Sequence, residues 1–139
     1  MNTRVLVLWA TWASLLWAAV LTGMAAAGST WVLDRVAGGY FVDEGFMPMW
    51  LRVLYGVQTV IIVLVAWLAK RYFHNDVTHR QRNLGRLIVL GFTVSATVNA
   101  FSQSQPERYN AIAAAITVIG IAVLRRRPVS EFVDIRARR

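Results

Sequence analysis

The chain has 139 residues, which suffices for one domain, and 57% of them are hydrophobic while 16% are charged. The formal net charge of +8 would fit a nucleic-acid-binding protein, and the lack of cysteine excludes disulfides and thiol chemistry. The apolar residues fall into four long runs separated by short polar stretches, whereas the helices of a soluble domain need a polar face. The composition therefore predicts an integral membrane protein.

The four apolar runs are predicted to be membrane-spanning helices at about residues 5–27, 49–69, 87–101 and 109–124. A hydrocarbon core about 30 Å thick requires roughly 20 apolar residues of helix, so the third and fourth runs are short. Backbone polar groups in lipid must be paired within the segment, which a helix achieves. We therefore expect a single all-α domain, residues 1–139, built as a four-helix bundle with up-down-up-down topology.

The first run contains no charged residue and ends at Ala25-Ala26-Ala27, which resembles a signal-peptide cleavage site. It is longer than the roughly 7–15 apolar residues of a signal peptide, so we interpret it as a retained span. Small residues that let helices approach closely in lipid recur at every fourth position. In the first run they are Ala10, Ser14, Ala18, Thr22 and Ala26, and in the third run Gly91, Ser95 and Asn99. These rows predict helix-packing faces.

The loop after the first run is expected to contain a short interfacial helix. Ser29-Thr30 is a typical helix start, and Gly38-Gly39 is a typical helix end. Its apolar residues would then lie flat on the membrane surface: Trp31, Val32, Val36 and Tyr40.

The distribution of the basic residues predicts the orientation. If the N-terminus is inside, the cytoplasmic segments hold most of the 15 basic residues, whereas the outer loops carry more acidic than basic residues. We therefore expect both termini in the cytoplasm, a basic cytoplasmic tail at residues 125–139, and a location in the cell (cytoplasmic) membrane. The charge then attracts anionic lipid heads on the cytoplasmic side, and no nucleic acid is expected as a partner.

Two motifs carry a resemblance to a known family. Pro48-Met49-Trp50-Leu51-Arg52 fits the pattern P-x-x-L-R, and the stretch from Asn99 to Tyr109 fits N-x-x-S-x-S-x-x-E-[RK]-Y. The chain thereby resembles a family of uncharacterised four-helix membrane proteins that is common in actinobacteria and also found in Gram-positive rods. The resemblance implies the fold and the topology but no activity.

Both motifs are expected on the outer side of the membrane, where six polar residues are candidates for one cluster: Arg52, Asn99, Ser102, Ser104, Glu107 and Arg108. One interpretation is an outward-facing site for a small polar group such as a lipid head. The other is structural: Glu107 pairs with Arg52 or Arg108, or it occupies the first turn of the fourth helix, where the dipole stabilises a carboxylate.

The chain shows no constellation typical of catalysis. No ionisable residue lies at mid-membrane depth, which argues against a coupled transporter or a pump. Both histidines, His74 and His79, lie outside the predicted spans, and we expect no cofactor and no metal site. The sequence favours an accessory or scaffold subunit of a larger membrane complex, with a membrane-protein partner or further copies of itself. The alternative is a lipid- or small-ligand-binding bundle, and an oligomeric channel or transporter is less favoured.

Overall fold

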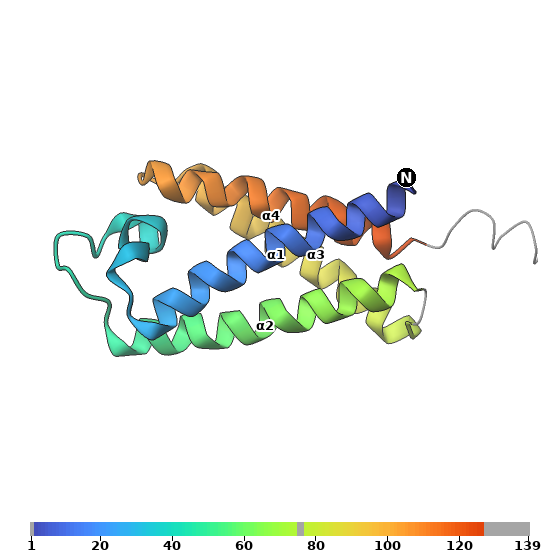
Figure 1. The fold of residues 1–139 in the computed structure, drawn as a ribbon, viewed down its shortest axis with the longest axis horizontal. Helices are drawn as coiled ribbons and strands as arrows, with labels where there is room; N and C mark the ends of the chain where they lie inside the picture. Colours follow the sequence, from blue (N-terminus) through green and yellow to red (C-terminus); the bar gives the residue numbers. More distant parts are fainter. Residues whose placement is uncertain (1, 75–76, 127–139) are drawn as a thin grey trace, which may run out of the picture.

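The computed structural model describes residues 2–74 and 77–126, so most of the predicted basic tail lies outside the described residues (Figure 1). The elements are α1 (Thr3–Ala27), η1 (Thr30–Arg35), η2 (Ala37–Gly39), α2 (Met49–Phe73), α3 (His79–Ala100) and α4 (Gln105–Leu124). The described chain is all-helical, as predicted, and each of its four long helices overlaps one of the four apolar runs, with α3 beginning eight residues before its run and α4 four residues before. Three of them, α1, α2 and α4, are long and apolar enough to cross a membrane.

Helix α3 is not apolar enough over its length to be counted with these three, because its first two turns are polar. Thr78 caps the helix: its hydroxyl accepts the N–H of Gln81, and the Gln81 side chain accepts the N–H of Thr78. This capping box starts the helix well before the apolar run. The apolar part from Leu87 to Ala100 is about 21 Å long at 1.5 Å per residue, which is less than a hydrocarbon core.

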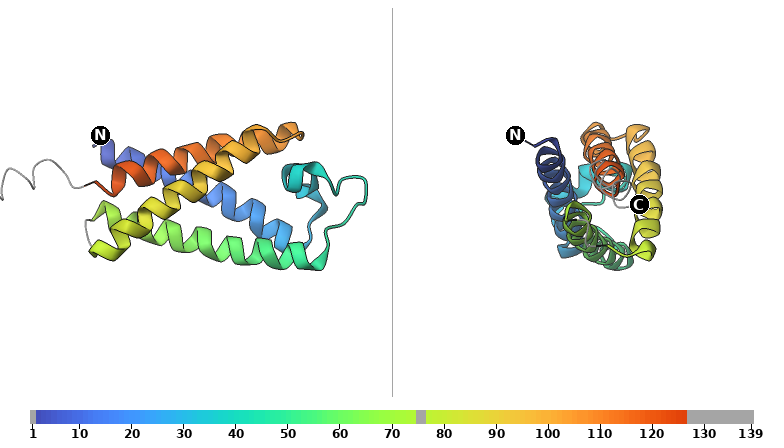
Figure 2. Two further views of the ribbon diagram at one scale, coloured as in Figure 1. Left: turned by 180° about the vertical axis from the view of Figure 1, so that it is seen from behind. Right: turned by 90° about the vertical axis from the view of Figure 1, so that its right-hand side faces the viewer.

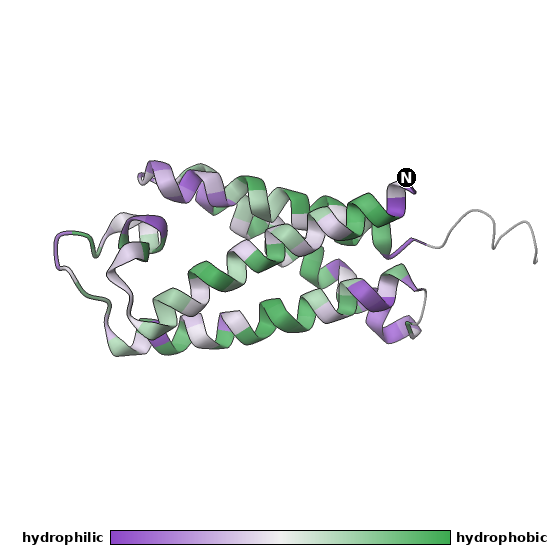
Figure 3. Ribbon diagram, in the orientation of Figure 1, coloured by the Kyte–Doolittle hydropathy of each residue, from purple (hydrophilic) through white to green (hydrophobic). Residues whose placement is uncertain are grey.

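Large hydrophobic side chains are exposed along all four long helices. Leu16 on α1, Leu64 on α2, Leu90 on α3 and Ile119 on α4 are examples. Hydrophobic residues occupy the middle of the long helices, and hydrophilic residues gather toward the ends of the molecule (Figure 3). Soluble monomers rarely expose contiguous apolar surface on this scale, so the structure has the surface of a protein surrounded by lipid.

Arginine side chains join the helix ends. Near the start of α1, one Arg4 nitrogen, Nη2, donates to the carbonyl oxygens of Tyr72 (3.2 Å), Phe73 (3.4 Å) and Leu124 (3.3 Å). The last carbonyls of a helix have no partner within the helix and carry partial negative charge, which a cation offsets. Arg4 therefore joins the start of α1 to the ends of α2 and α4. We call this end of the molecule the N-terminal end of the bundle.

A second arginine contact explains the P-x-x-L-R motif. The helix start at Pro48 places Arg52 in the first turn of α2, where its Nε and Nη2 donate to the carbonyls of Ala26 (3.1 Å) and Ala27 (3.0 Å) at the end of α1. Gly28 ends α1 with a φ of 79°, and a Cβ there would lie 2.7 Å from the Cζ of Arg52. A glycine is therefore required both by the backbone and by the arginine that packs on it.

The small-residue row of α1 lies largely inside the bundle. The Ser14 and Thr117 hydroxyls are 2.8 Å apart between α1 and α4, and Thr59 of α2 donates to the Thr22 hydroxyl at 2.8 Å. Of the predicted packing residues of α1, Ser14 and Thr22 are buried, Ala18 and Ala26 are half-buried and Ala10 is exposed. Hydroxyl pairs of this kind are typical of helix–helix contacts in membranes.

The loop between α1 and α2 differs from the expected interfacial helix. It forms two short 3₁₀ helices, and Val32 and Val36 are buried against Leu21 and Ala25 of α1 instead of lying on the surface. Trp31 and Tyr40 are exposed. The valines turn inward because η1 packs on both α1 and α4 and closes this end of the bundle, which we call the loop end.

Candidate functional site

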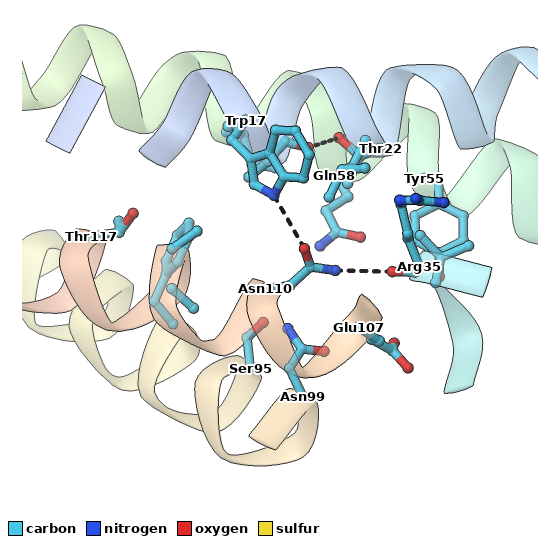
Figure 4. A pocket seen from close by; sticks show the side chains of 17 residues that line it. Trp17, Thr22, Arg35, Tyr55, Gln58, Ser95, Asn99, Glu107, Asn110 and Thr117 are labelled. Atoms are coloured by element: carbon cyan, nitrogen blue, oxygen red, sulfur yellow. Dashed lines mark hydrogen bonds between the residues drawn. The ribbon is translucent and has the colours of Figure 1, made fainter. Parts of the chain in front are cut away.

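A cavity of about 170 Å³ lies inside the bundle near the loop end, and we call it the chamber (Figure 4). All four long helices and η1 contribute polar side chains to its lining. They include Trp17, Arg35, Gln58, Ser95, Asn99, Glu107 and Asn110. Polar residues from segments far apart in the sequence therefore meet in a largely apolar protein.

One wall of the chamber is held by hydrogen bonds. Trp17 Nε1 of α1 donates to Asn110 Oδ1 at 3.2 Å, and Asn110 Nδ2 of α4 donates to the Arg35 carbonyl at 2.9 Å (Figure 4). The Arg35 guanidinium pairs with Asp34, donates to the Trp31 carbonyl at 2.9 Å and lies 4.4 Å from the centre of the Trp31 ring. The charge of Arg35 is thus compensated within the loop.

Glu107 contributes a carboxylate without a cationic partner. It lies in the first turn of α4, is 8% exposed and accepts a hydrogen bond from the Ser102 hydroxyl. Within residues 2–74 and 77–126 the only ion pair joins Arg35 and Asp34, so Glu107 pairs with neither of the arginines considered from the sequence. Its first-turn position agrees with the structural interpretation, and it also leaves one uncompensated negative charge at the chamber wall.

Three further polar side chains in the chamber have no partner in the described part of the chain. They are Gln58 of α2 and Ser95 and Asn99 of α3, which lie one helical turn apart on the same face. Gln58 is exposed and Ser95 and Asn99 are half-buried, so their polar groups are open to the space beside them, where lipid chains would supply no hydrogen-bond partner. The arrangement therefore calls for water or a polar ligand in the chamber.

The chamber continues into an apolar groove between α2 and α3. Helix α2 packs mainly on α1 and α3 mainly on α4, while α2 and α3 scarcely touch each other. Helix α3 runs obliquely from the end of α2 toward the start of α4 (Figure 2). The groove between them has a volume of about 350 Å³ and is lined by side chains such as Ile61, Val65, Ile88 and Phe92. Gln58, Ser95 and Phe92 line both spaces.

The structure separates the residues of the predicted outer cluster. Four of them lie together at the turn between α3 and α4: Ser102, Ser104, Glu107 and Arg108. Arg108 Nε donates to the Ser102 carbonyl at 2.6 Å. The Ser104 hydroxyl donates to the carbonyl of Asp34 and so ties this turn to η1. Asn99 lines the chamber beside them, whereas Arg52 lies apart, on the end of α1.

The sequence analysis missed several residues of the chamber. Gln58 is the only amide in the second apolar run, and a polar residue inside a span is a signal that would have drawn attention to it. Asn110 directly follows the second motif and carried no signal of its own. Trp17 and Arg35 belong to the chamber only because the bundle brings α1 and η1 against α4.

Comparison with known proteins yields no match to a family model, a curated protein or a solved structure. The resemblance to the four-helix actinobacterial family therefore stays a prediction.

Proposed function

We propose that this is a multi-pass protein of the cytoplasmic membrane that binds an amphiphilic small molecule, with the polar head in the chamber and the apolar part in the groove between α2 and α3. The observation that carries the proposal is the set of unpartnered polar groups, Gln58, Ser95 and Asn99, in a chamber that continues into an apolar groove. Such a pairing of a small polar cavity with an apolar channel matches the two parts of a lipid-like molecule.

The chemistry of the lining indicates the kind of polar head. The amides of Gln58 and Asn99 both donate and accept, the Ser95 hydroxyl does the same, and the Glu107 carboxylate only accepts. A head with N–H or O–H donors, such as an ammonium or a polyol, would satisfy the carboxylate and the amides together. The groove opens toward the sides of the bundle, so the ligand would enter from the lipid phase.

The membrane location rests on the three span-like helices and the exposed apolar surface. The fourth crossing, α3, has a shorter apolar part, which Arg86 at its start extends by snorkelling toward the lipid heads. The contacts of Arg4 and Arg52 support alternating helix directions because each joins the start of one helix to the end of another. The positive-inside rule then places both termini in the cytoplasm.

Reporter fusions test this topology. A reporter that is active only in the cytoplasm is expected to work after Arg139 or within residues 75–78 and to fail at Asp43. Activity at Asp43 together with silence at the C-terminus would invert the orientation and contradict the proposal.

The hypothesis of an accessory subunit was drawn from the small-residue rows and remains untested. Both rows face other parts of the same chain. The hydroxyls of Ser14 and Thr22 form hydrogen bonds with α4 and α2, and Gly91 and Ser95 line the groove. The face of α1 is therefore occupied within the bundle, and the face of α3 borders the groove that the proposed ligand would fill, so neither requires a partner chain. The geometry therefore favours the ligand-binding alternative.

A variant at the junction of chamber and groove tests ligand binding. Ser95→Leu is expected to block the passage, and native mass spectrometry from mild detergent should show at least roughly tenfold less co-purifying amphiphile than for wild type, since a hydrogen bond and the space are both lost. The matched control is Thr97→Leu, on the exposed side of α3, which should retain the amphiphile. A wild-type protein that carries no small molecule but co-purifies with another membrane protein would refute the proposal and support the accessory subunit.

A further inference from the structure

A second polar cavity lies at the N-terminal end of the bundle, away from the chamber. Its volume is about 270 Å³, and it lies between the first two turns of α3 and the end of α4. We call it the arginine cup. It is lined by His79, Arg82, Asn83, Arg86, Arg125 and Arg126. The four α3 residues occupy positions i, i+3, i+4 and i+7, so they share one face of the helix and converge on the same space.

Within the described residues, the lining of the arginine cup gathers positive charge and contains no acidic side chain. Four of its six lining residues are arginines, none is acidic, and the one ion pair of the described chain lies at the loop end. Like charges that converge in one cavity repel each other. The positive end of the α3 dipole adds to this field, and the carbonyl end of α4, which Arg82 contacts, offsets part of it. A bound anion would relieve this repulsion.

The position of Arg125 is built into the fold. Arg82 Nη1 donates to the Arg125 carbonyl at 3.2 Å, which anchors the end of α4 on α3. Gly85, the buried residue of α3, leaves room for the Tyr72 ring, because a Cβ there would lie 2.5 Å from the Tyr72 hydroxyl oxygen, and the Arg125 Cδ lies next to them, 3.5 Å from the same Cβ position. The Nε of Arg125 is buried and has no hydrogen-bond partner among residues 2–74 and 77–126. A buried donor without an acceptor is rare in proteins, so this atom points to a missing acceptor.

We propose that the arginine cup binds a phosphate group. Phosphate offers several acceptor oxygens to the guanidinium groups of two helices at once, and arginine recognises it through paired hydrogen bonds. This site is independent of the chamber, which lies at the opposite end of the bundle. In the proposed topology the arginine cup faces the cytoplasmic lipid heads, so the phosphate belongs either to an anionic lipid or to a soluble phosphate compound.

Thermal unfolding in mild detergent tests the phosphate site. Inorganic phosphate is expected to raise the melting temperature more than chloride does at the same ionic strength. Arg86→Gln and Arg126→Gln, each tested alone, should weaken phosphate binding roughly tenfold, as expected for the loss of one charged hydrogen bond. Arg80→Gln is the matched control, because Arg80 is an exposed arginine of the same helix that does not line the arginine cup.

A second arm of the experiment uses nanodiscs and distinguishes the source of the phosphate. If the protein unfolds at a higher temperature in phosphatidylglycerol than in phosphatidylcholine, and this difference disappears in Arg86→Gln and persists in Arg80→Gln, the site binds a lipid head. Stabilisation by inorganic phosphate alone, with the same dependence on the variants, assigns it to a soluble compound. The proposal would be overturned if phosphate and chloride raised the melting temperature equally and the two lipids also had equal effects. It would also be overturned if Arg80→Gln weakened the stabilisation as much as Arg86→Gln does.

Discussion

Replacing Gly120 by alanine is expected to destabilise the bundle by about 1–3 kcal/mol, the usual range for overpacking a close contact. At Gly120, α4 lies against Thr11 of α1, which is fully buried. A Cβ on residue 120 would overlap the Thr11 hydroxyl and lie 3.0 Å from the Thr11 Cβ, so the two helices would have to move apart. Alanine favours helix formation by about 1 kcal/mol over glycine, and the clash must outweigh this gain. Unfolding in a mixed-detergent titration measures the change.

The chain offers a control and a rescue for this prediction. Gly91 also lies within a helix, but a Cβ there would meet nothing within 4 Å, so Gly91→Ala should leave stability unchanged or raise it slightly. Adding Thr11→Ala to Gly120→Ala removes the overlapping hydroxyl and should recover part of the loss. If both glycine variants unfold alike, the close approach of α1 and α4 is not as the structure has it.

The second large effect is expected for Arg4→Gln, with a loss of roughly 2 kcal/mol in the free energy of unfolding. Arg4 is the one side chain that reaches the carbonyl ends of both α2 and α4 from α1 in the described structure. A hydrogen bond to a charged group contributes about 1.5–3 kcal/mol, and glutamine is too short and uncharged to replace it. The same detergent titration measures the loss.

Arg80→Gln serves as the control here too, because it removes the same charge from the same end of the bundle at an exposed position. It should shift the unfolding curve by less than about 0.5 kcal/mol. Equal destabilisation by the two variants would mean that overall charge, rather than the contacts of Arg4, stabilises this end of the protein.

Local signals in the sequence determined the helices and their ends. Runs of apolar residues predicted the four long helices, because only a helix pairs every backbone group in lipid, and α4 begins at Gln105, before the apolar run that predicted it. Gly28 ends α1 and a capping box starts α3, both through contacts between residues that are neighbours along the chain. The all-α class and the approximate helix positions follow from such local rules.

The tertiary structure decided which side chains meet. A helix that is apolar on every side carries no periodic pattern that reveals its inward face, so the rotation of α2 that turns Gln58 into the chamber was not readable from the sequence. The same holds for Arg52 and Glu107, which the motifs placed together and the packing places apart. Val32 points inward because η1 packs against α1 and α4. Each outcome depends on the relative rotation and crossing of helices, which arises from the summed packing of residues far apart in the chain.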